Sequence, residues 1–351
     1  MFERKIGHCL TGLAITCCLL WVGCGGKADS KSHADAQGSS LPPTTSSLDT
    51  VPDALQRYAQ ILRSDPNNIP ALGKRGRLLW SLGRLQEARR DFTVILEIDP
   101  SNIAALNDRA RLLTEMGQDR EALYDWEDLL LIQPLDPMVR SGLGNVFLRM
   151  GRTREALEQF KYAIQIAPGR EDLLLNAAAA EYQLGNFEGA RLAYQEILAM
   201  NPQSAEALNG IGLITQFVDS DETLAEQNYR QALALDPNLA GAWFNIAFLE
   251  AGRGLNMKAI EDFGNAIRLD STYIDARLNR GLLYINDRQP ERAVPDLEWI
   301  TRRRPDHGHA WLLLGWAHCL SHDGIKGCLE LSKAKELKQA GAEKLMAEHC
   351  K

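Results

Sequence analysis

The sequence lacks several features that would direct it to a particular function. Its formal net charge is -7, so it has no basic surplus of the kind that nucleic-acid-binding proteins carry. It has no glycine-rich phosphate-binding loop, no nucleophile elbow and no acid pair at a catalytic spacing. We therefore expect no nucleic-acid partner, no cofactor and no enzymatic activity.

Cysteine is scarce outside the amino-terminal segment. Four of the seven cysteines lie within the first 24 residues, which indicates a targeting segment rather than a disulfide framework. Cys319 and Cys328 flank a turn between two expected helices, so a disulfide between them is one interpretation, and Cys350 would then keep a free thiol. His318 and His322 are four residues apart, but no glutamate motif or Cys-x-x-Cys pair accompanies them, so we expect no metal site.

Long apolar runs are also missing. The apolar stretch at the amino terminus covers residues 6–22, whereas a membrane-spanning helix needs about 20 such residues. Arg4 and Lys5 precede this stretch, and Cys24, Gly25 and Gly26 follow it. A positive region, an apolar core and small residues in this order are typical of a secretory signal.

Residues 20–24 resemble the lipobox of bacterial lipoproteins, in which a small residue precedes a cysteine that accepts a diacylglycerol. Gly23 and Cys24 fit that pattern, whereas Trp21 stands where the family usually has leucine. The resemblance implies that residues 1–23 are a signal peptide and that Cys24 carries lipid. It also implies a place in the bacterial cell envelope, at the outer membrane facing the periplasm in two-membrane bacteria and outside the cell membrane otherwise. An uncleaved membrane anchor is the alternative.

Residues 24–50 are rich in Gly, Ser, Ala, Thr and Pro and contain almost no large apolar side chains. Such a segment cannot bury enough surface to offset the entropy lost on ordering. We therefore expect a flexible, lipid-attached linker that holds the folded part clear of the membrane.

Prolines that can end a helix recur at a spacing of 34 residues. They are Pro66, Pro100, Pro134, Pro168 and Pro202, followed by Pro237 after one inserted residue, Ser271 in the same phase, and Pro305. Proline ends a helix because it lacks an amide proton and crowds the preceding turn. A period of this length indicates an array of repeats.

Small and bulky residues recur in the same phase as the prolines. The eighth place of each unit holds Gly76, Ala110, Gly144, Ala178, Gly212, Ala247, Gly281 and Gly315, and the twentieth holds Ala88, Ala122, Ala156, Ala190, Ala225, Ala259, Ala293 and Gly327. Four places later come Phe92, Trp126, Phe160, Tyr194, Tyr229, Phe263, Leu297 and Leu331. Two antiparallel helices can approach closely only if the residues at their crossing are small. We expect the bulky residues to fill the space between one helix pair and the next.

This pattern resembles the tetratricopeptide repeat family over residues 51 to about 341. The resemblance implies an all-α fold, a right-handed superhelical α-solenoid of about eight helix-turn-helix repeats. We expect an extra helix at 51–68, repeats at 69–102, 103–136, 137–170, 171–204, 205–239, 240–273, 274–307 and 308–341, and a capping helix at 342–351. A pentatricopeptide array has a similar period but reads RNA, which does not suit a secreted acidic protein.

Four positions depart from the repeat pattern. Arg288 replaces a turn glycine, and Pro295 lies inside a second helix, which we expect it to kink or shorten. Arg140 and Arg277 occupy a first-helix place that is usually large and apolar.

In this family the first helices line a concave groove that binds peptides or proteins. The groove residues that the resemblance implies are Arg77, Trp80, Asn107, Arg111, Asn145, Tyr182, Asn209, Phe244, Phe248, Leu282 and Trp316. Arginines and aromatic residues most often dominate binding energies, and asparagines can bond to a ligand backbone. Adjacent first helices also pack together, so apolar residues such as Leu278, Leu282 and Leu312 are either ligand surface or inter-repeat core.

We expect a membrane-tethered scaffold or adaptor that binds proteins or peptides and organises the cell envelope. Two other interpretations remain at this point. One is a receptor for a hydrophobic small molecule or lipid, with the region from Phe244 to Trp316 as its wall. The other is a structural protein that self-associates as a homo-oligomer.

Overall fold

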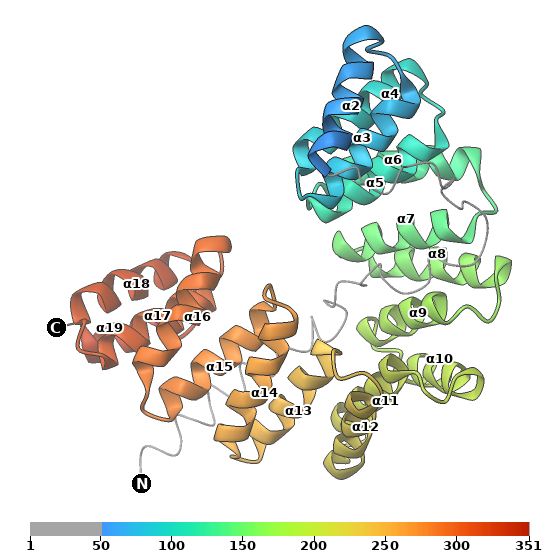
Figure 1. The fold of residues 1–351 in the computed structure, drawn as a ribbon. Coiled ribbons are helices and arrows are strands. Elements are labelled where there is room, and N and C mark those ends of the chain that lie inside the picture. Colours follow the sequence, from blue (N-terminus) through green and yellow to red (C-terminus); the bar gives the residue numbers. More distant parts are fainter. Residues whose placement is uncertain (1–50, 351) are drawn as a thin grey trace. The chain divides into compact units, whose positions relative to one another are not determined.

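The computed structural model describes residues 51–350, which form 18 helices and no strands (Figure 1). A single helix, α2 (Val51–Ser64), precedes eight helix pairs, and α19 (Ala342–His349) follows them. The first helices are α3 (Ile69–Ser81), α5 (Ile103–Glu115), α7 (Pro137–Arg149), α9 (Glu171–Gln183), α11 (Ala205–Phe217), α13 (Ala240–Gly252), α15 (Ile274–Asn286) and α17 (Gly308–Leu320). The second helices are α4 (Leu85–Ile98), α6 (Asp119–Ile132), α8 (Thr153–Ile166), α10 (Phe187–Met200), α12 (Glu222–Leu235), α14 (Asn256–Leu269), α16 (Pro290–Arg303) and α18 (Gly324–Glu336).

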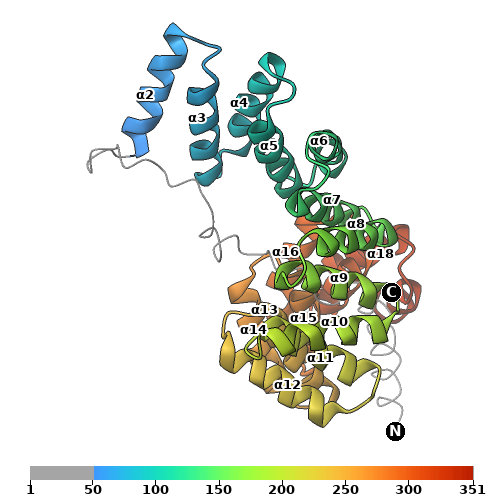
Figure 2. The same ribbon diagram turned by 90° about the vertical axis from the view of Figure 1, so that its right-hand side faces the viewer.

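The described residues form two compact units, an N-terminal unit of residues 51–193 and a C-terminal unit of residues 194–350. The division falls inside α10. Within each unit a first helix packs on the second helix of its own repeat, as α3 does on α4 and α13 does on α14 (Figures 1 and 2). The expected all-α repeat fold is confirmed.

Each helix pair is joined by a turn that requires one left-handed residue. Glycine supplies it in five repeats, as at Gly83, where φ is 73°. The amide of the next residue, Arg84, then donates to the carbonyl of Leu79 at 2.9 Å, which closes the Schellman arrangement at the end of α3. Arg288 and His322 adopt the same conformation without being glycine, with φ of 60° and 65°. The turn is therefore kept where its preferred residue is missing.

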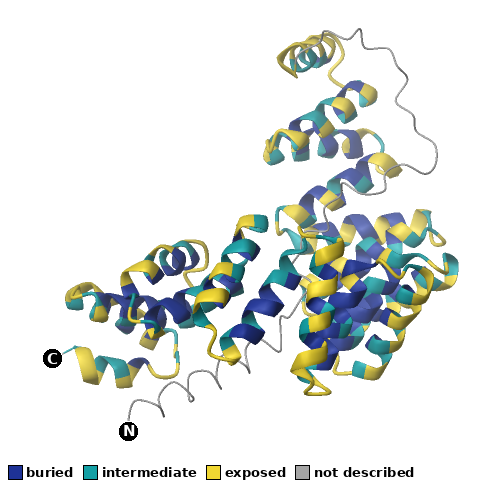
Figure 3. Cartoon of the chain, turned by 60° about the horizontal axis from the view of Figure 1, so that its bottom comes forward, coloured by how far each residue is buried: buried dark blue, intermediate teal, exposed yellow. Residues whose placement is uncertain are grey.

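The helix crossings are dry and close because their residues are small. The alanines at the twentieth position are 0% exposed in all seven repeats that have one. At Gly76 an added Cβ would lie 2.7 Å from the Phe92 ring, and at Gly144 it would lie 2.5 Å from the Phe160 ring. Figure 3 shows the buried residues along the facing sides of the helices and the exposed ones on the outer sides. From the sequence we had expected this ring to fill the space before the next helix pair. In these repeats it instead fills the space within its own helix pair.

Position 6 of the first helix decides how neighbouring repeats join. In the third and fifth repeats it is glycine, Gly142 and Gly210, and a Cβ there would collide with the ring of Trp126 or Tyr194 from the preceding repeat. In the second, fourth and sixth repeats it is a polar residue that bonds to the preceding first helix. These pairs are Asp108 with Arg77 (2.6 Å), Asn176 with Ser141 (3.4 Å) and Asn245 with Asn209 (2.8 Å). From the second to the sixth repeat, the joints thus alternate between an interlocked ring and a polar link.

Three repeats are held together by a buried aspartate that accepts two hydrogen bonds from one arginine. Arg109 donates to both oxygens of Asp125 at 2.8 and 2.6 Å, and Arg75 holds Asp91 in the same way. Asp125 is 2% exposed, so its charge depends on this partner. In the seventh repeat Asp296 is held by Arg280. The pair joins position 7 of the first helix to position 23 of the same repeat.

Arg140 and Arg277, which occupy a first-helix position that is usually apolar, are accommodated in the same way. Arg277 donates to Asp296 at 2.8 Å and its guanidinium lies 4.3 Å from the centre of the Trp299 ring. Arg140 donates to Gln159 at 3.1 Å and lies 4.9 Å from the ring centre of Tyr162. Each arginine stem therefore covers apolar surface while its head is hydrogen-bonded and stacked on a ring.

Pro295 does not shorten its helix. The helix α16 has 14 residues, as does α14 in the repeat before it. The expectation of a shorter helix was therefore wrong, because the packing of Leu297 and Ile300, both 0% exposed, outweighs one lost backbone hydrogen bond.

Two glycines in α3 test the crossing directly. Gly76→Ala should lower the free energy of unfolding by about 1–3 kcal/mol, because the new methyl group overlaps Phe92. At Gly73 an added Cβ would meet only Ile95 Cδ1, at 3.8 Å, so Gly73→Ala should raise it by up to about 1 kcal/mol through its helix propensity. Urea unfolding followed by circular dichroism measures both. Equal effects of the two substitutions would contradict the crossing model.

Candidate functional site

The candidate site is the first-helix face, which we define as positions 5, 9 and 12 of the first helices in each unit. In the N-terminal unit most of the groove residues expected from the sequence are accessible. Arg77, Arg111 and Asn145 are exposed, and Trp80 and Asn107 are half-buried. Tyr182 is the exception, because it is 7% exposed.

Contacts between α3 and α5 organise the polar part of this face. Arg77 donates to Asp108 at 2.6 Å, and the indole nitrogen of Trp80 donates to Glu115 at 2.7 Å. The guanidinium of Arg111 lies 5.7 Å from the centre of the Trp80 ring. The guanidinium of Arg111 on α5 therefore lies beside the Trp80 ring of α3, whose indole nitrogen is hydrogen-bonded to Glu115.

The charges on this face remain available to a ligand. The Arg77 side chain is 55% exposed, whereas that of Asp108 is only 12% exposed, so Asp108 depends on this partner. Arg77 donates to Asp108 through Nε, and its other nitrogens can bond to a ligand without breaking this pair. Arg111 forms no ion pair with any residue of 51–350. Arg111 is exposed, so its charge is available to a ligand carboxylate.

In the C-terminal unit most residues at the same positions are buried in packing contacts between helices. Asn209, Phe244 and Leu282 are 7%, 4% and 8% exposed. The Phe244 ring stacks on Tyr273, with 5.0 Å between ring centres, and Asn209 accepts a hydrogen bond from Asn245. Of the three leucines left open by the sequence, Leu282 and Leu312 are buried and Leu278 is half-buried. The accessible apolar residues of this face are Phe248, Trp316 and Leu278.

Two residues at position 2 of a first helix carry perturbed acid-base properties that the sequence did not indicate. Burial raises the pKa of Asp275 to about 6. Burial lowers the pKa of His309 to about 4, and the nearby His307 contributes to that shift. At neutral pH His309 is therefore uncharged. Asp275 is ionised, and its burial makes this charged form lower the stability of the folded state. Burial likewise raises the pKa of Tyr182 to about 12.

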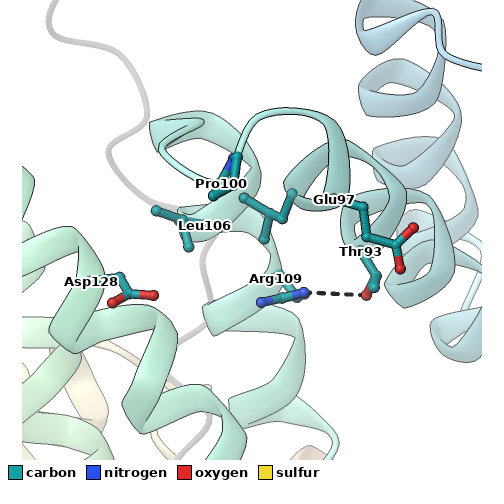
Figure 4. A pocket seen from close by; sticks show the side chains of 7 residues that line it. Thr93, Glu97, Pro100, Leu106, Arg109 and Asp128 are labelled. Atoms are coloured by element: carbon teal, nitrogen blue, oxygen red, sulfur yellow. Dashed lines mark hydrogen bonds between the residues drawn. The ribbon is translucent and has the colours of Figure 1, made fainter.

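A small cavity lies between α4, α5 and α6 in the N-terminal unit. Its volume is about 200 Å³, below the range of about 300–1,000 Å³ that is typical of small-molecule sites. Figure 4 shows Arg109 bonded to Thr93 at one side and Asp128 at the other. Its lining residues are Thr93, Leu96, Glu97, Pro100, Leu106, Arg109 and Asp128. Arg109 is held by Asp125, and the lining also carries the carboxylates of Glu97 and Asp128.

The structure corrects the expected disulfide. Cys328 is bonded to Cys350, with 5.7 Å between their Cα atoms, and Cys319 keeps its thiol. The sequence interpretation failed because the docking of α19 brings Cys350 beside α18, which the spacing of 22 residues does not reveal. His318 and His322 have different roles. His318 is buried and bonded to Glu330 at 2.6 Å, whereas His322 is the exposed left-handed residue of the turn.

The signal peptide, Cys24 and the linker at 24–50 lie outside the described residues. Within residues 51–350, no helix combines the length and the hydropathy that crossing a bilayer requires.

Comparison with known proteins identifies the repeat. Models of the tetratricopeptide repeat family match residues 50–103, 147–213 and 278–320. The human DnaJ homolog subfamily C member 7 is 38% identical over 107 residues, which are 28% of this chain and 20% of that protein. The human protein O-mannosyl-transferase TMTC3 is 26% identical over 163 residues, 45% of this chain and 18% of that protein. The matches thus span about a fifth of the length of these curated relatives.

Among solved structures, the APC/C hetero-tetramer Cut9–Hcn1 has a TM-score of 0.58 at 17% identity, over 86% of this chain and 60% of that one. This likeness shows the fold. The chain therefore contains tetratricopeptide repeats, and its fold is the one that typically serves as a protein-interaction scaffold without enzymatic activity.

The shifted carboxyl of Asp275 makes stability depend on pH. An unfolded aspartate titrates near 3.9, so the unfolded state ionises first and stability falls as pH rises from about 4 to 6. Asp275→Asn should therefore raise the free energy of unfolding at pH 7 by about 1–2 kcal/mol, since the side chain is partly exposed, and should have little effect at pH 4. Glu261→Gln removes the same charge at an exposed site of α14. Urea unfolding measures the free energy of unfolding of both variants across this pH range. The assignment of the shifted pKa to Asp275 is refuted if the two variants show the same dependence on pH.

Proposed function

We propose that this chain, whose repeats are tetratricopeptide repeats, is a membrane-tethered scaffold that binds other proteins through extended segments laid on its first-helix face. The observation that carries the proposal is the group of Arg77, Trp80 and Arg111, which is ordered by contacts between repeats and still accessible. Tryptophan and arginine are among the residue types most often found at the centres of binding energy. The fixed geometry of this group reduces the entropy lost when a ligand binds.

The chemistry of the N-terminal unit favours a segment that contains acidic residues. Arg111 has no carboxylate partner among the described residues, and Arg77 can bond to a ligand through the nitrogens that Asp108 does not use. Asn107 and Asn145 can bond to the backbone of a peptide regardless of its sequence. An acidic or polar segment crossing α3, α5 and α7 would use all four side chains.

The C-terminal unit would receive apolar side chains. Phe248 lies tilted against Phe217, with 5.9 Å between ring centres, and it is half-buried, so part of its side chain is accessible. Trp316 and Leu278 are half-buried on first helices of later repeats. A partner with an acidic and an apolar segment would engage the two units differently.

In-cell photocrosslinking tests the face itself. A photoreactive residue at position 111 should yield crosslinked partner several-fold more efficiently than one at Leu131, which is 82% exposed on the second helix of the same repeat. Both sites are exposed, but they lie on different helices. Mass spectrometry of the products therefore separates binding to the first-helix face from nonspecific crosslinking. Equal yields from both positions would exclude the proposed face.

Two further outcomes would redirect the proposal. Crosslinks that join two copies of this chain from position 111 would favour self-association. A lipid that copurifies and is displaced by Phe248→Asp would favour a receptor for hydrophobic small molecules. Either result would replace the peptide ligand proposed here.

We further propose that the scaffold is anchored in the bacterial cell envelope by lipid on Cys24. The support is the sequence of residues 20–26, in which glycine and cysteine follow an apolar stretch. Several acyl chains on one cysteine would hold the protein firmly, because each buried methylene contributes about 0.8 kcal/mol. The partners would then be envelope proteins or their assembly factors.

Metabolic labelling tests the anchor. In bacterial cells given an alkyne analogue of palmitate, the full chain should become labelled and sediment with membranes. Cys24→Ser should abolish both, because no thiol remains at the modified position. Cys18→Ser, a substitution of the same kind within the apolar stretch, should keep both. Label retained in Cys24→Ser would refute lipidation at this residue.

A further inference from the structure

Three cysteines meet at the carboxyl-terminal end of the array. Cys319 lies near the end of α17, Cys328 on α18, and Cys350 directly after α19. Cys328 and Cys350 share a disulfide, and Cys319 is a free thiol. The sulfur atoms of all three lie within 4.8 Å of one another. A free thiol therefore stands next to a disulfide, within reach of both of its sulfurs.

The close crossing of α17 and α18 places Cys319 there. Both crossing positions are glycine in this repeat, and a Cβ at Gly327 would lie 2.5 Å from the Cys319 sulfur and 2.7 Å from the carbonyl of Gly315. The missing side chain lets Cys319 lie against the residue that precedes Cys328. Cys319 is half-buried, and burial together with the charge of Glu330 raises the pKa of its thiol. The thiol is thus held in place and mostly protonated at neutral pH.

The disulfide joins α19 to the rest of the C-terminal unit. Leu345 and Met346 of α19 pack against a buried cluster that contains Leu312 and Leu331, which are 2% and 0% exposed. Ala342, at the start of α19, is 1% exposed. The helix therefore covers the apolar end of the last repeat. Its eight residues are too few to be stable as an isolated helix, so its position depends on this packing and on the disulfide.

We propose that the three cysteines form a thiol–disulfide exchange site, in which Cys319 displaces Cys350 from Cys328 and thereby releases α19. Cys319 loses its proton, and its thiolate attacks the sulfur of Cys328. The bond between Cys328 and Cys350 breaks as the bond between Cys319 and Cys328 forms. Cys350 leaves as a thiolate and takes up a proton. One disulfide is exchanged for another, so no oxidant or reductant is consumed.

The exchange would convert the end of the array from capped to open. With Cys350 freed, α19 is held by the packing of Ala342, Leu345 and Met346 and by an exposed ion pair between Lys335 and Glu343. Its departure would expose the end of the last repeat around Leu312 and Leu331. It would also present Cys350 as an accessible thiol that can attack a disulfide of a partner, forming a mixed disulfide as one sulfur of that partner disulfide leaves as a thiolate and takes up a proton.

Disulfide mapping tests the exchange on the full chain with Cys9, Cys17, Cys18 and Cys24 changed to serine. After incubation without reductant at pH 8.5, free thiols are blocked with N-ethylmaleimide and the peptides are mapped by mass spectrometry. The proposal expects two species, a major one blocked at Cys319 and a minor one blocked at Cys350 with Cys319 joined to Cys328. In Cys319→Ser, blocking at Cys350 should fall at least tenfold.

A second pair of variants links the exchange to the helix. Met346→Asp weakens the docking of α19 and should raise the fraction blocked at Cys350 several-fold, whereas Glu348→Ala, on the exposed side of the same helix, should leave it unchanged. Amide hydrogen exchange of residues 342–349 should rise with that fraction. The proposal is overturned if Cys319 is the blocked residue in every protein that retains it, or if Cys350 is blocked equally in Cys319→Ser.

Discussion

The structure depends on one steric constraint, which is that two helices can cross closely only where neither has a bulky side chain. Alanine or glycine at the eighth and twentieth positions satisfies it in all eight repeats, and these residues are shielded from water throughout. The large residue four places further on then closes the remaining space. The turn residue matters less than the helix crossing, because the crossing is preserved in the repeats where Arg288 and His322 adopt the left-handed conformation in place of glycine. A non-glycine residue in that conformation costs about 1–2 kcal/mol, so the crossing outweighs the turn.

The repeat could be recognised from the sequence because its constraints are local and periodic. Prolines, small residues and turn glycines recur at fixed places, and eight occurrences in register leave little ambiguity about the fold. The disulfide could not be recognised in this way. It depends on where α19 docks, which is decided by the packing of Leu345 and Met346 against the cluster around Leu312 and Leu331. The arginine–aspartate pairs were also missed, because only three repeats contain them and no single one is conspicuous.

The candidate site was foreseen less completely than the fold. The sequence left open which apolar residues of the first helices are core and which are ligand surface. The structure buries Phe244 and Leu282 and leaves the polar group around Arg77, Trp80 and Arg111 accessible. A hydrophobic residue at such a position can either pack against a neighbouring repeat or contact a ligand. Only its distance from the neighbouring first helices distinguishes these two roles, and the sequence does not give that distance. Polar residues were read more reliably because burying them without partners is costly. The binding role of both groups stays a prediction.

The alternation at position 6 has a consequence for how such an array can change length during evolution. If residues 137–170 were removed, the ring of Trp126 would meet Asn176, which occupies position 6 of the following repeat, instead of the glycine that now makes room for it. If residues 137–204 were removed, the ring would again meet a glycine, Gly210. In this part of the chain, gain or loss of sequence is therefore easier to accommodate in steps of two repeats than in steps of one.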